Sequence, residues 1–170
     1  TPIKADLYKN LINQLEDGEK LVFIRHAYAP GNGDPAGFNL NDCFTQRNLS
    51  ENGKRQAQRI GEFFNKNKIE IDKVLSSEWC RCKETAKIAF KNYSTNSFLN
   101  SFYSAKFSKN KDKQIKAFNK YIKNFKGKKN LILITHYVFI SEVLNYGPSS
   151  GEIVVSDKNL NIIGSIEIDF

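Results

Sequence analysis

Hydrophobic residues recur along the chain at two different spacings. In residues 3–16 they stand four apart, at Leu7, Leu11 and Leu15, which predicts a helix that ends at Gly18. Similar patterns predict further helices over residues 51–66, 79–91, 110–125 and 138–145. Short apolar runs instead predict buried strands at 20–26, 72–77 and 129–136, a weaker strand at 97–102, and a terminal hairpin from 151–157 and 161–169.

Strands and helices alternate for most of the chain, an order typical of a parallel sheet that is covered on both faces. We therefore expect an α/β fold, a three-layer α/β/α sandwich with a mostly parallel central sheet. No repeat or linker divides the 170 residues, so a single domain over 1–170 is expected. No apolar run approaches the length of about 18 residues that a membrane helix needs, so no transmembrane segment is expected.

Polar residues follow three of the predicted strands directly. They are Arg25–His26, Ser76–Ser77 and Thr135–His136. Arg81 follows the second of these strands by one helical turn. Because ligands of such sheets bind beyond the carboxyl ends of the strands, two histidines and two arginines are expected to converge at one edge.

This convergence favours a site for a phosphoryl group. Guanidinium groups offer planar forks of donors to phosphate oxygens, and a neutral imidazole can attack phosphorus to form a phosphohistidine. The arginines would stabilise charge on the transferred group, so no metal and no cofactor are expected. The alternative from the residues alone is that both histidines are structural.

Positive charge is concentrated in residues 106–129, which hold ten lysines and one acid, Asp112, in a chain of net charge +8. This segment is either a solvated helix face or a basic rim that attracts an anionic substrate, an acidic protein or a membrane surface. Nucleic acid is not expected as a partner. Phe118, Tyr121 and Phe125 fall on one helix face, which indicates packing on a core rather than stacking on bases.

The cysteines do not have the spacing of a zinc site. Cys43, Cys80 and Cys82 are expected to be free thiols in a reducing compartment, or one disulfide and one free thiol in an oxidising one. The sequence contains no methionine, which indicates that an initiator residue, a tag or a signal peptide has been removed.

Four segments resemble the histidine phosphatase superfamily, which has the phosphoglycerate mutase-like fold. They are "FIRHA", "RNLSENGKRQAQRIG", "VLSSEWCRCKETA" and "LILITHY", in the family's order and covering about residues 21–155. The loop "RHAYAPGNGDP…DCFTQRNLS" and the tail "SGEIVV" resemble a short bacterial subgroup whose members are often exported. The resemblance implies a periplasmic or secreted protein if a signal peptide was removed, and a cytoplasmic one otherwise.

The resemblance also implies roles for individual residues. His26 would be the phosphorylated nucleophile, and Arg25 and Arg81 would hold the phosphoryl oxygens. His136 would complete the phosphate pocket, with Ser77 close to it. Asn32 would bind phosphate, by analogy with an asparagine that some members use.

The chain departs from the family pattern in three ways. Ala27 and Tyr137 stand where glycine is common, and Tyr137 would shape the mouth of the site. The segment after the third strand lacks the glutamate that serves many members as general acid. The proton donor is therefore Asp34, Asp42, Glu152 or none, and a missing donor favours a phosphoramidate, which can leave already protonated at nitrogen.

Within the resemblance, Cys43 and Cys80 would both line the mouth, so we predict that they form a disulfide in an exported protein. The predicted function is a cofactor-independent phosphatase that hydrolyses a phosphomonoester or a phosphoramidate through a phosphohistidine on His26. Its partner would be a phosphorylated small molecule or a phosphoprotein. The short chain argues against mutase activity, and the alternative function is a catalytically weak module that binds a phosphorylated ligand.

Overall fold

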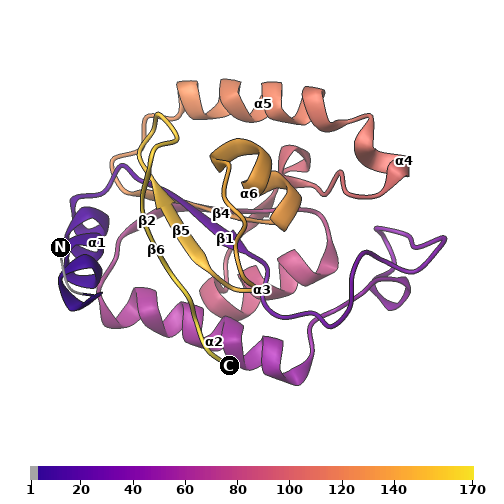
Figure 1. Cartoon of the computed structure of the whole chain (residues 1–170), viewed down its shortest axis with the longest axis horizontal. Helices are drawn as coiled ribbons and strands as arrows, with labels where there is room; N and C mark the ends of the chain where they lie inside the picture. Colours follow the sequence, from indigo (N-terminus) through magenta and orange to yellow (C-terminus); the bar gives the residue numbers. More distant parts are fainter. Residues whose placement is uncertain (1–3) are drawn as a thin grey trace.

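A computed structural model describes residues 4–170, which form a six-stranded sheet in the order β3-β2-β4-β1-β5-β6 (Figure 1). The strands are β1 (Leu21–Arg25), β2 (Ile71–Ser76), β3 (Ser94–Thr95), β4 (Asn130–Thr135), β5 (Ile153–Ser156) and β6 (Ile162–Ile166). Strands β1 to β4 pair in parallel, whereas β5 and β6 pair antiparallel at one edge. The mostly parallel sheet and the terminal hairpin are confirmed.

Helices cover both faces of this sheet, which confirms the three-layer α/β/α prediction. They are α1 (Lys4–Asp17), α2 (Glu51–Lys66), α3 (Cys80–Phe90), α4 (Ala105–Ser108), α5 (Lys111–Asn124) and α6 (Tyr137–Leu144), with 3₁₀ turns η1 (Cys43–Thr45) and η2 (Ser97–Leu99). In Figure 1, α2 and α3 lie below the sheet, and α5 and α6 lie above it. Each described helix is too short or too polar to span a membrane.

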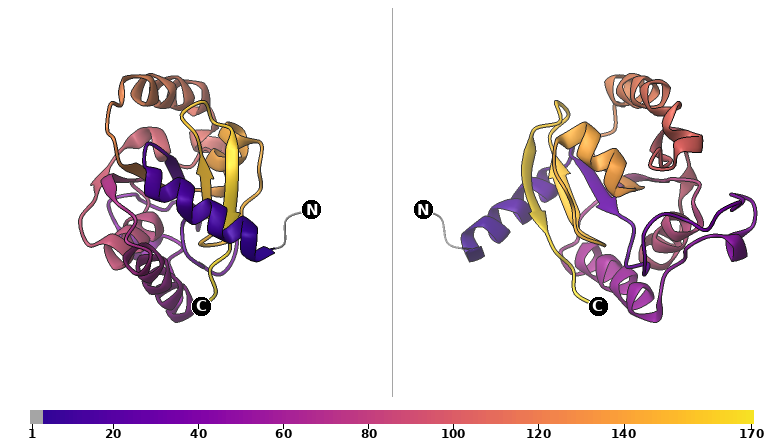
Figure 2. Two further views of the ribbon diagram at one scale, coloured as in Figure 1. Left: turned by 90° about the vertical axis from the view of Figure 1, so that its left-hand side faces the viewer. Right: turned by 45° about the vertical axis from the view of Figure 1, so that its right-hand side comes forward.

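Two buried clusters fill the space between these layers. One cluster joins α1, α2 and α3 to one side of the sheet, through residues such as Leu15, Ile60 and Ile132. The other joins α5 and α6 to the opposite side, through Phe118, Phe139 and Leu133. Every residue of β4 is buried, because this central strand is covered on both faces. Figure 2 shows α1 lying across the β5–β6 hairpin, and Leu11 of α1 packs against β6 at Gly164.

The predicted helix starts agree with the structure. Ser50 is the N-cap of α2, where its hydroxyl accepts a hydrogen bond from the backbone of Gly53. Gly53 packs so closely on the carbonyl of Tyr28 that a side chain would not fit there. The first residue of the predicted 3–16 helix, Ile3, lies outside the described residues.

The predicted strand at 97–102 is wrong. The parallel pairing in this region is limited to the two residues of β3, and residues 97–99 instead form η2. The Asn96 side chain accepts a hydrogen bond from the backbone of Phe98, which starts the turn. Phe98 and Leu99 are both buried in the α5–α6 cluster, whereas neighbouring residues of a strand would face opposite sides.

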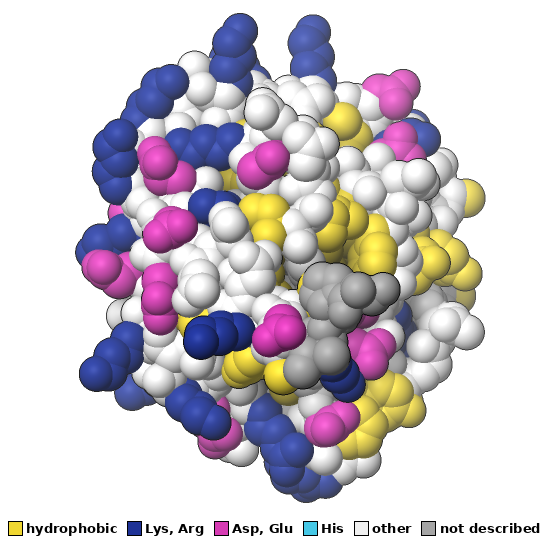
Figure 3. Space-filling model, turned by 60° about the vertical axis from the view of Figure 1, so that its left-hand side comes forward, with side chains coloured by type: hydrophobic (Ala, Val, Ile, Leu, Met, Phe, Trp, Pro, Cys, Tyr) yellow, Lys and Arg dark blue, Asp and Glu magenta, His cyan; other side chains and the backbone are white. Residues whose placement is uncertain are grey.

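The aromatic face of the lysine-rich segment packs inward, as predicted. Phe118 is fully buried in α5, and Tyr121 and Phe125 pack against the same cluster. Basic side chains project outward from the end of the molecule that α5 occupies (Figure 3). Lys111 pairs at 3.5 Å with Glu142 on α6, both exposed. Whether the lysines bind a partner stays a prediction.

Candidate active site

The ends of β1, β4 and β2 bring the predicted residues together. Arg25 lies opposite Thr135 in the β1–β4 register, and the backbone of His26 donates to the Thr135 carbonyl at 3.0 Å. The backbone of Ser77 donates to the Ile134 carbonyl at 2.9 Å, so the pairing continues beyond the formal end of β2. These main-chain bonds fix where each side chain starts, as the sequence predicts.

A cavity of about 840 Å³ opens at this edge. Six of the seven residues predicted for the site line it, and they are Arg25, His26, Asn32, Arg81, His136 and Tyr137. Ser77 is buried behind the wall and reaches the site through His136. No group of His, Cys, Asp or Glu side chains within residues 4–170 has an arrangement that would hold a metal ion.

His26 is buried and held as a neutral imidazole whose unprotonated Nε2 accepts a hydrogen bond from Arg81. Its Nδ1 lies 2.8 Å from the carbonyl of Ala27, and since a carbonyl only accepts, Nδ1 carries the proton. Burial, and then the charge of Arg81, hold the pKa of His26 well below its usual value. Arg81 donates from Nε to Nε2 at 3.2 Å. The nitrogen that would attack a phosphorus atom is therefore unprotonated and beside a guanidinium.

Arg81 is fixed by a buried ion pair. Its Nη1 lies 2.8 Å from Oδ1 of Asp34, and the two side chains are only 4% and 6% exposed. The indole of Trp79 donates to the other carboxylate oxygen at 3.0 Å. Burial works to raise the pKa of Asp34, but the hydrogen bond and charge of Arg81 outweigh it and hold this pKa below its usual value. Asp34 is therefore an ionised partner of Arg81.

His136 is oriented by Ser77. The Ser77 hydroxyl lies 2.8 Å from Nε2 of His136, and the thiol of Cys82 lies 3.5 Å from the same nitrogen. Burial, followed by the charge of Arg81, holds the pKa of His136 well below its usual value, so the ring is neutral. The Ser77 hydroxyl also lies 3.3 Å from Oδ1 of Asn100, so its one proton has two acceptors within reach, of which Nε2 is the nearer. When Ser77 donates to Nε2, the proton of the ring stands on Nδ1, which has no partner among the described residues. Nδ1 is then free to donate to an oxygen in the cavity.

Arg25 has a spare donor as well. Its Nη1 donates to the carbonyl of Pro148 at 2.9 Å, and its guanidinium lies 5.3 Å from the centre of the Tyr137 ring. Its Nε is buried and has no partner within residues 4–170. Arg25, Arg81 and His136 thus line the same cavity as His26 and bring donors suited to phosphoryl oxygens, with Arg81 directly at Nε2.

Sequence reasoning missed a third arginine. Arg47 donates from Nε to the carbonyl of Gly33 at 2.6 Å and from Nη1 to the carbonyl of Ala29, and it lines the cavity. Burial, and then the charge of Arg81, lower the pKa of its guanidinium. The only signal in the sequence is its position just before the start of α2. Tyr103 and Lys106 were missed too, because the path of residues 100–106 depends on the turn at η2.

None of the three candidate proton donors is placed as a free acid at the cavity. Asp34 lines the cavity but is held ionised by Arg81. Asp42 caps η1, where it accepts from the backbone of Phe44, and it does not line the cavity. Glu152 is buried elsewhere, where it accepts from the Tyr146 hydroxyl and the Ser149 backbone. The option of no carboxylic acid donor therefore fits the geometry best.

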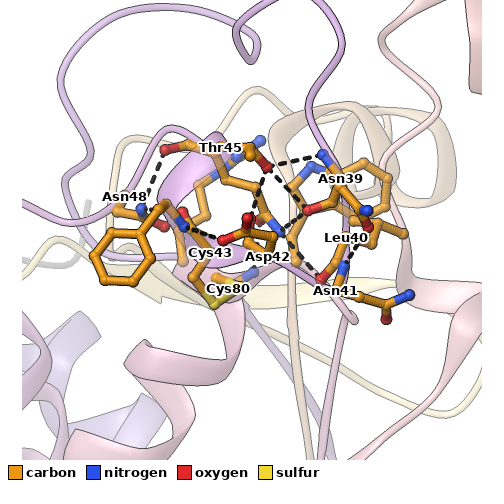
Figure 4. The surroundings of a disulfide bond; sticks show 12 residues. Asn39, Leu40, Asn41, Asp42, Cys43, Thr45, Asn48 and Cys80 are labelled. Carbon is orange, nitrogen blue, oxygen red and sulfur yellow. Dashed lines mark hydrogen bonds between the residues drawn. A yellow bond between two sulfur atoms is a disulfide. The ribbon is translucent and has the colours of Figure 1, made fainter.

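The predicted disulfide between Cys43 and Cys80 is present, with 5.7 Å between the Cα atoms (Figure 4). Figure 4 shows it beside a hydrogen-bonded turn that contains Asn39, Asp42 and Thr45. Because Cys80 begins α3, the disulfide ties the loop after β1 to the helix that carries Arg81. Cys82 remains a free thiol, and burial raises its pKa to about 12, which keeps it protonated and inert.

Comparison with known proteins identifies both the sequence family and the fold. Residues 21–101 match the model of the histidine phosphatase superfamily, branch 1. Two solved structures with similar folds are the protein histidine phosphatase SixA complexed with tungstate and the phosphoglycerate mutase of Thermus thermophilus. The SixA structure is 16% identical, with a TM-score of 0.53, and covers 88% of this chain and 96% of its own. The mutase is 15% identical, with a TM-score of 0.60, and covers 88% and 99%.

A third similar structure is a phosphoserine phosphatase mutant from Entamoeba histolytica in complex with phosphoserine. It is 18% identical, with a TM-score of 0.54, and covers 80% of this chain and 89% of its own. No curated protein sequence matches this chain. At these identities the solved structures establish the fold, and the family comes from the match over residues 21–101.

Proposed function

This chain belongs to the histidine phosphatase superfamily, and we propose that it hydrolyses phosphorylated compounds through a phosphohistidine formed on His26. The observation that carries the proposal is the state of His26. Its Nδ1 proton is committed to the carbonyl of Ala27, and its neutral Nε2 faces a cavity with arginine donors. A nucleophile at phosphorus needs an unprotonated nitrogen with positive charge beside it. The Arg81 Nε–H that Nε2 accepts is given up to a phosphoryl oxygen when phosphorus approaches.

In the first step, Nε2 of His26 forms a bond to phosphorus while the bond to the leaving group breaks, and the electron pair departs with the leaving group. Arg25 and Arg81 hold the phosphoryl oxygens, and Nδ1–H of His136 donates to one of them. In the second step, water attacks the phosphorus, the P–N bond breaks, and its electrons return to Nε2. The water gives its OH to the phosphate, and its other proton is released to solvent, from which the departed leaving group has taken up a proton. The products are inorganic phosphate, the protonated leaving group and free His26.

The preferred leaving group depends on which side chains can supply it with a proton. Because Asp34 is ionised and Asp42 and Glu152 lie off the cavity, no carboxylic acid stands ready to protonate a departing alkoxide. The site therefore favours groups that leave without help, such as the protonated nitrogen of a phosphoramidate or a stabilised oxyanion. One protein with this fold, SixA, is a protein histidine phosphatase. A phosphorylated protein or small molecule would be the substrate of this chain.

The test is to trap the intermediate. The wild-type protein, mixed rapidly with phosphoramidate and quenched in base to preserve P–N bonds, is expected to carry one added phosphoryl group on the peptide that contains His26. His26→Ala is expected to carry none and to lose turnover, and EDTA is expected to leave the wild-type rate unchanged. A His26→Ala protein with wild-type turnover would falsify the proposal.

A second candidate function is supported by the absence of a free acid. The same pocket would then hold a phosphorylated ligand without turning it over. Tight phosphate binding, together with no turnover of phosphoramidates, aryl phosphates or alkyl phosphates, would favour this function over a phosphatase.

We also propose that the protein works in an oxidising compartment, as a periplasmic or secreted protein. The support is the disulfide, since such bonds persist in compartments of this kind. Alkylation of protein taken from its native compartment is expected to label Cys82 alone after unfolding. Labelling of all three cysteines would contradict this placement.

A further inference from the structure

The outer part of the cavity is larger than the proposed reaction alone requires. The volume of about 840 Å³ is in the range of sites for ligands of drug size, whereas a phosphoryl group fills only the inner end at His26. We define the outer part by the residues that line it away from His26 and Arg81. They are Pro35, Gly37, Phe38, Tyr103, Lys106 and Tyr137. A leaving group therefore has room for a ring and its substituents.

The cavity carries more positive charge than one phosphoryl group would neutralise. Four cationic side chains line it, which are Arg25, Arg47, Arg81 and Lys106. The only carboxylate among the lining residues is Asp34, which is already paired with Arg81. A phosphoryl dianion at His26 thus leaves about one positive charge without a counter-ion. Lys106, on α4, is the cationic lining residue that is exposed to solvent.

Lys106 is exposed at the cavity mouth and is not engaged with a carboxylate within residues 4–170. Its ammonium lies 5.5 Å from the centre of the neighbouring Phe107 ring, a ring that packs on Trp79 and Phe38. This contact with a packed aromatic ring limits the directions that the lysine can take. The result is an exposed positive charge among the residues that line the cavity.

Two tyrosines flank the same opening. Tyr103 is 65% exposed and Tyr137 is 45% exposed, although both line the cavity. Large aromatic side chains lose favourable contacts when they are left in water, and they bind ligand rings at low entropic cost because they have few rotatable bonds. Tyr137 is also steadied by the guanidinium of Arg25 below it. Both rings therefore offer faces to a ring of the leaving group.

We propose that the outer part of the cavity binds a leaving group that contains a ring and a second anionic group. The anionic group lies at Lys106, and the ring packs on Tyr103 or Tyr137. The inference rests on the proposed function for the meaning of "leaving group", but the binding preference that it states can be measured without turnover. The ring is a sugar or an aromatic system, and the experiment separates these two sources.

The experiment uses two pairs of compounds that differ by one carboxylate. Phenyl phosphate is compared with 4-carboxyphenyl phosphate, and glucose 1-phosphate with glucuronic acid 1-phosphate. In each pair the member with the extra carboxylate is expected to have a kcat/KM about fivefold higher, mainly through KM, as for one exposed ion pair. The pair with the larger gain identifies the kind of ring, and the gain is expected to shrink as salt is added.

Lys106→Ala is expected to remove most of this gain. The matched control is Lys109→Ala, which removes the next lysine of the chain, one that does not line the cavity, and it is expected to keep the gain. Tyr103→Ala is expected to raise KM for both ring compounds by about fivefold relative to glycerol phosphate. If the wild type hydrolyses both members of a pair without a gain, or if the gain survives Lys106→Ala, the inference is overturned.

Failure of the inference can be told from failure of the proposed function. Calorimetry on His26→Ala measures the affinity for both members of a pair when no turnover is possible. Equal affinities contradict the inference, whatever the wild-type protein hydrolyses. A preference for the carboxylated member that depends on Lys106 supports it, even if the wild-type protein turns over neither compound.

Discussion

The inner and outer parts of the cavity are built in different ways. Arg81, His26 and His136 are almost fully buried at the inner end, where strand ends and buried hydrogen bonds fix them. Tyr103, Lys106 and Tyr137 are exposed at the outer end, on a loop and at helix starts. The buried residues of the inner end therefore serve both the proposed chemistry and the stability of the fold. The exposed residues of the outer end would set the substrate preference, and they can be replaced with little loss of stability.

The largest effect is expected for Arg81→Ala. The substitution removes a phosphoryl-binding group, so kcat/KM is expected to fall by about 10³-fold or more. It also leaves the buried Asp34 carboxylate without a partner, which is expected to lower the free energy of unfolding by about 3–5 kcal/mol. Urea denaturation and steady-state kinetics measure the two effects separately.

A double variant tests the link between these two effects. Arg81→Ala combined with Asp34→Asn no longer buries an uncompensated charge, so most of the lost stability is expected to return while activity stays lost. If the double variant is as unstable as Arg81→Ala, the charge of Asp34 is not the cause, and the inner end is less tightly coupled to stability than proposed.

The second largest effect concerns the Cys43–Cys80 disulfide, which ties the loop after β1 to α3. Cys43→Ser with Cys80→Ser opens a loop closed over a sequence separation of 37, which is expected to cost about 3–4 kcal/mol of unfolding free energy. The loop that is released without the disulfide contains Pro35, Gly37 and Phe38, which line the outer part of the cavity. KM for ring-containing substrates is therefore expected to rise more than kcat falls. Dithiothreitol is expected to reproduce the loss in the wild type and to leave the variant unchanged. A reduced wild type with an unchanged urea midpoint would contradict this.

The inner residues could be predicted from the sequence because their positions follow from strand ends. Arg25, His26 and His136 directly follow apolar runs, and parallel pairing then requires them to meet at one edge. The side-chain partners were harder to predict. The pairing of Asp34 with Arg81 joins residues 47 positions apart through a loop whose path no periodicity describes.

Of the outer residues, Tyr137 could be predicted because it follows His136, whereas Tyr103 and Lys106 could not, for a related reason. Residues 97–102 have the composition of a strand, but a local hydrogen bond from the Asn96 side chain and the burial of two adjacent apolar residues produce a turn. The course of the chain after this turn decides where Tyr103 and Lys106 lie. Local sequence gives the elements, while tertiary packing decides which loop side chains face the cavity.

A third prediction concerns how the free energy of unfolding depends on pH, and it involves only residues of the inner end. His26 and His136 are buried and neutral in the folded state, with pKa values well below the 6.5 expected in the unfolded chain. Between these values the unfolded state binds more protons, so stability is complete above about pH 6.5 and is lost as pH falls below it. The limiting slope is about 1.4 kcal/mol per pH unit for each histidine, or about 2.7 for both.

Urea denaturation between pH 7 and pH 5 measures this slope. His26→Gln is the control, because it removes one of the two titrating groups and is expected to reduce the slope by about half. The acid limb of kcat/KM is expected well below pH 6.5, because kcat/KM reports the lowered pKa of His26 in the folded enzyme and protonation of Nε2 removes the nucleophilic electron pair. A slope near zero over this range would show that the histidines are not neutral through burial, and the contrast between the inner and outer ends would weaken.

The smallest expected effect concerns how Ser77 orients His136. Ser77→Ala removes the hydroxyl that lies 2.8 Å from Nε2, so the proton of the neutral ring is no longer confined to Nδ1. We expect kcat to fall about tenfold with little change in KM, as for the loss of one hydrogen bond that matters at the transition state. The ¹⁵N spectrum of the His136 ring is expected to show a mixture of tautomers in place of the Nδ1–H form.

Ser76→Ala is the matched control, because the Ser76 hydroxyl donates to the Ser77 carbonyl and not to the imidazole. If both variants lower kcat equally while the ring spectrum stays unchanged, Ser77 supports the strand end but does not set the tautomer, and the inner end owes its order to packing rather than to this hydrogen bond.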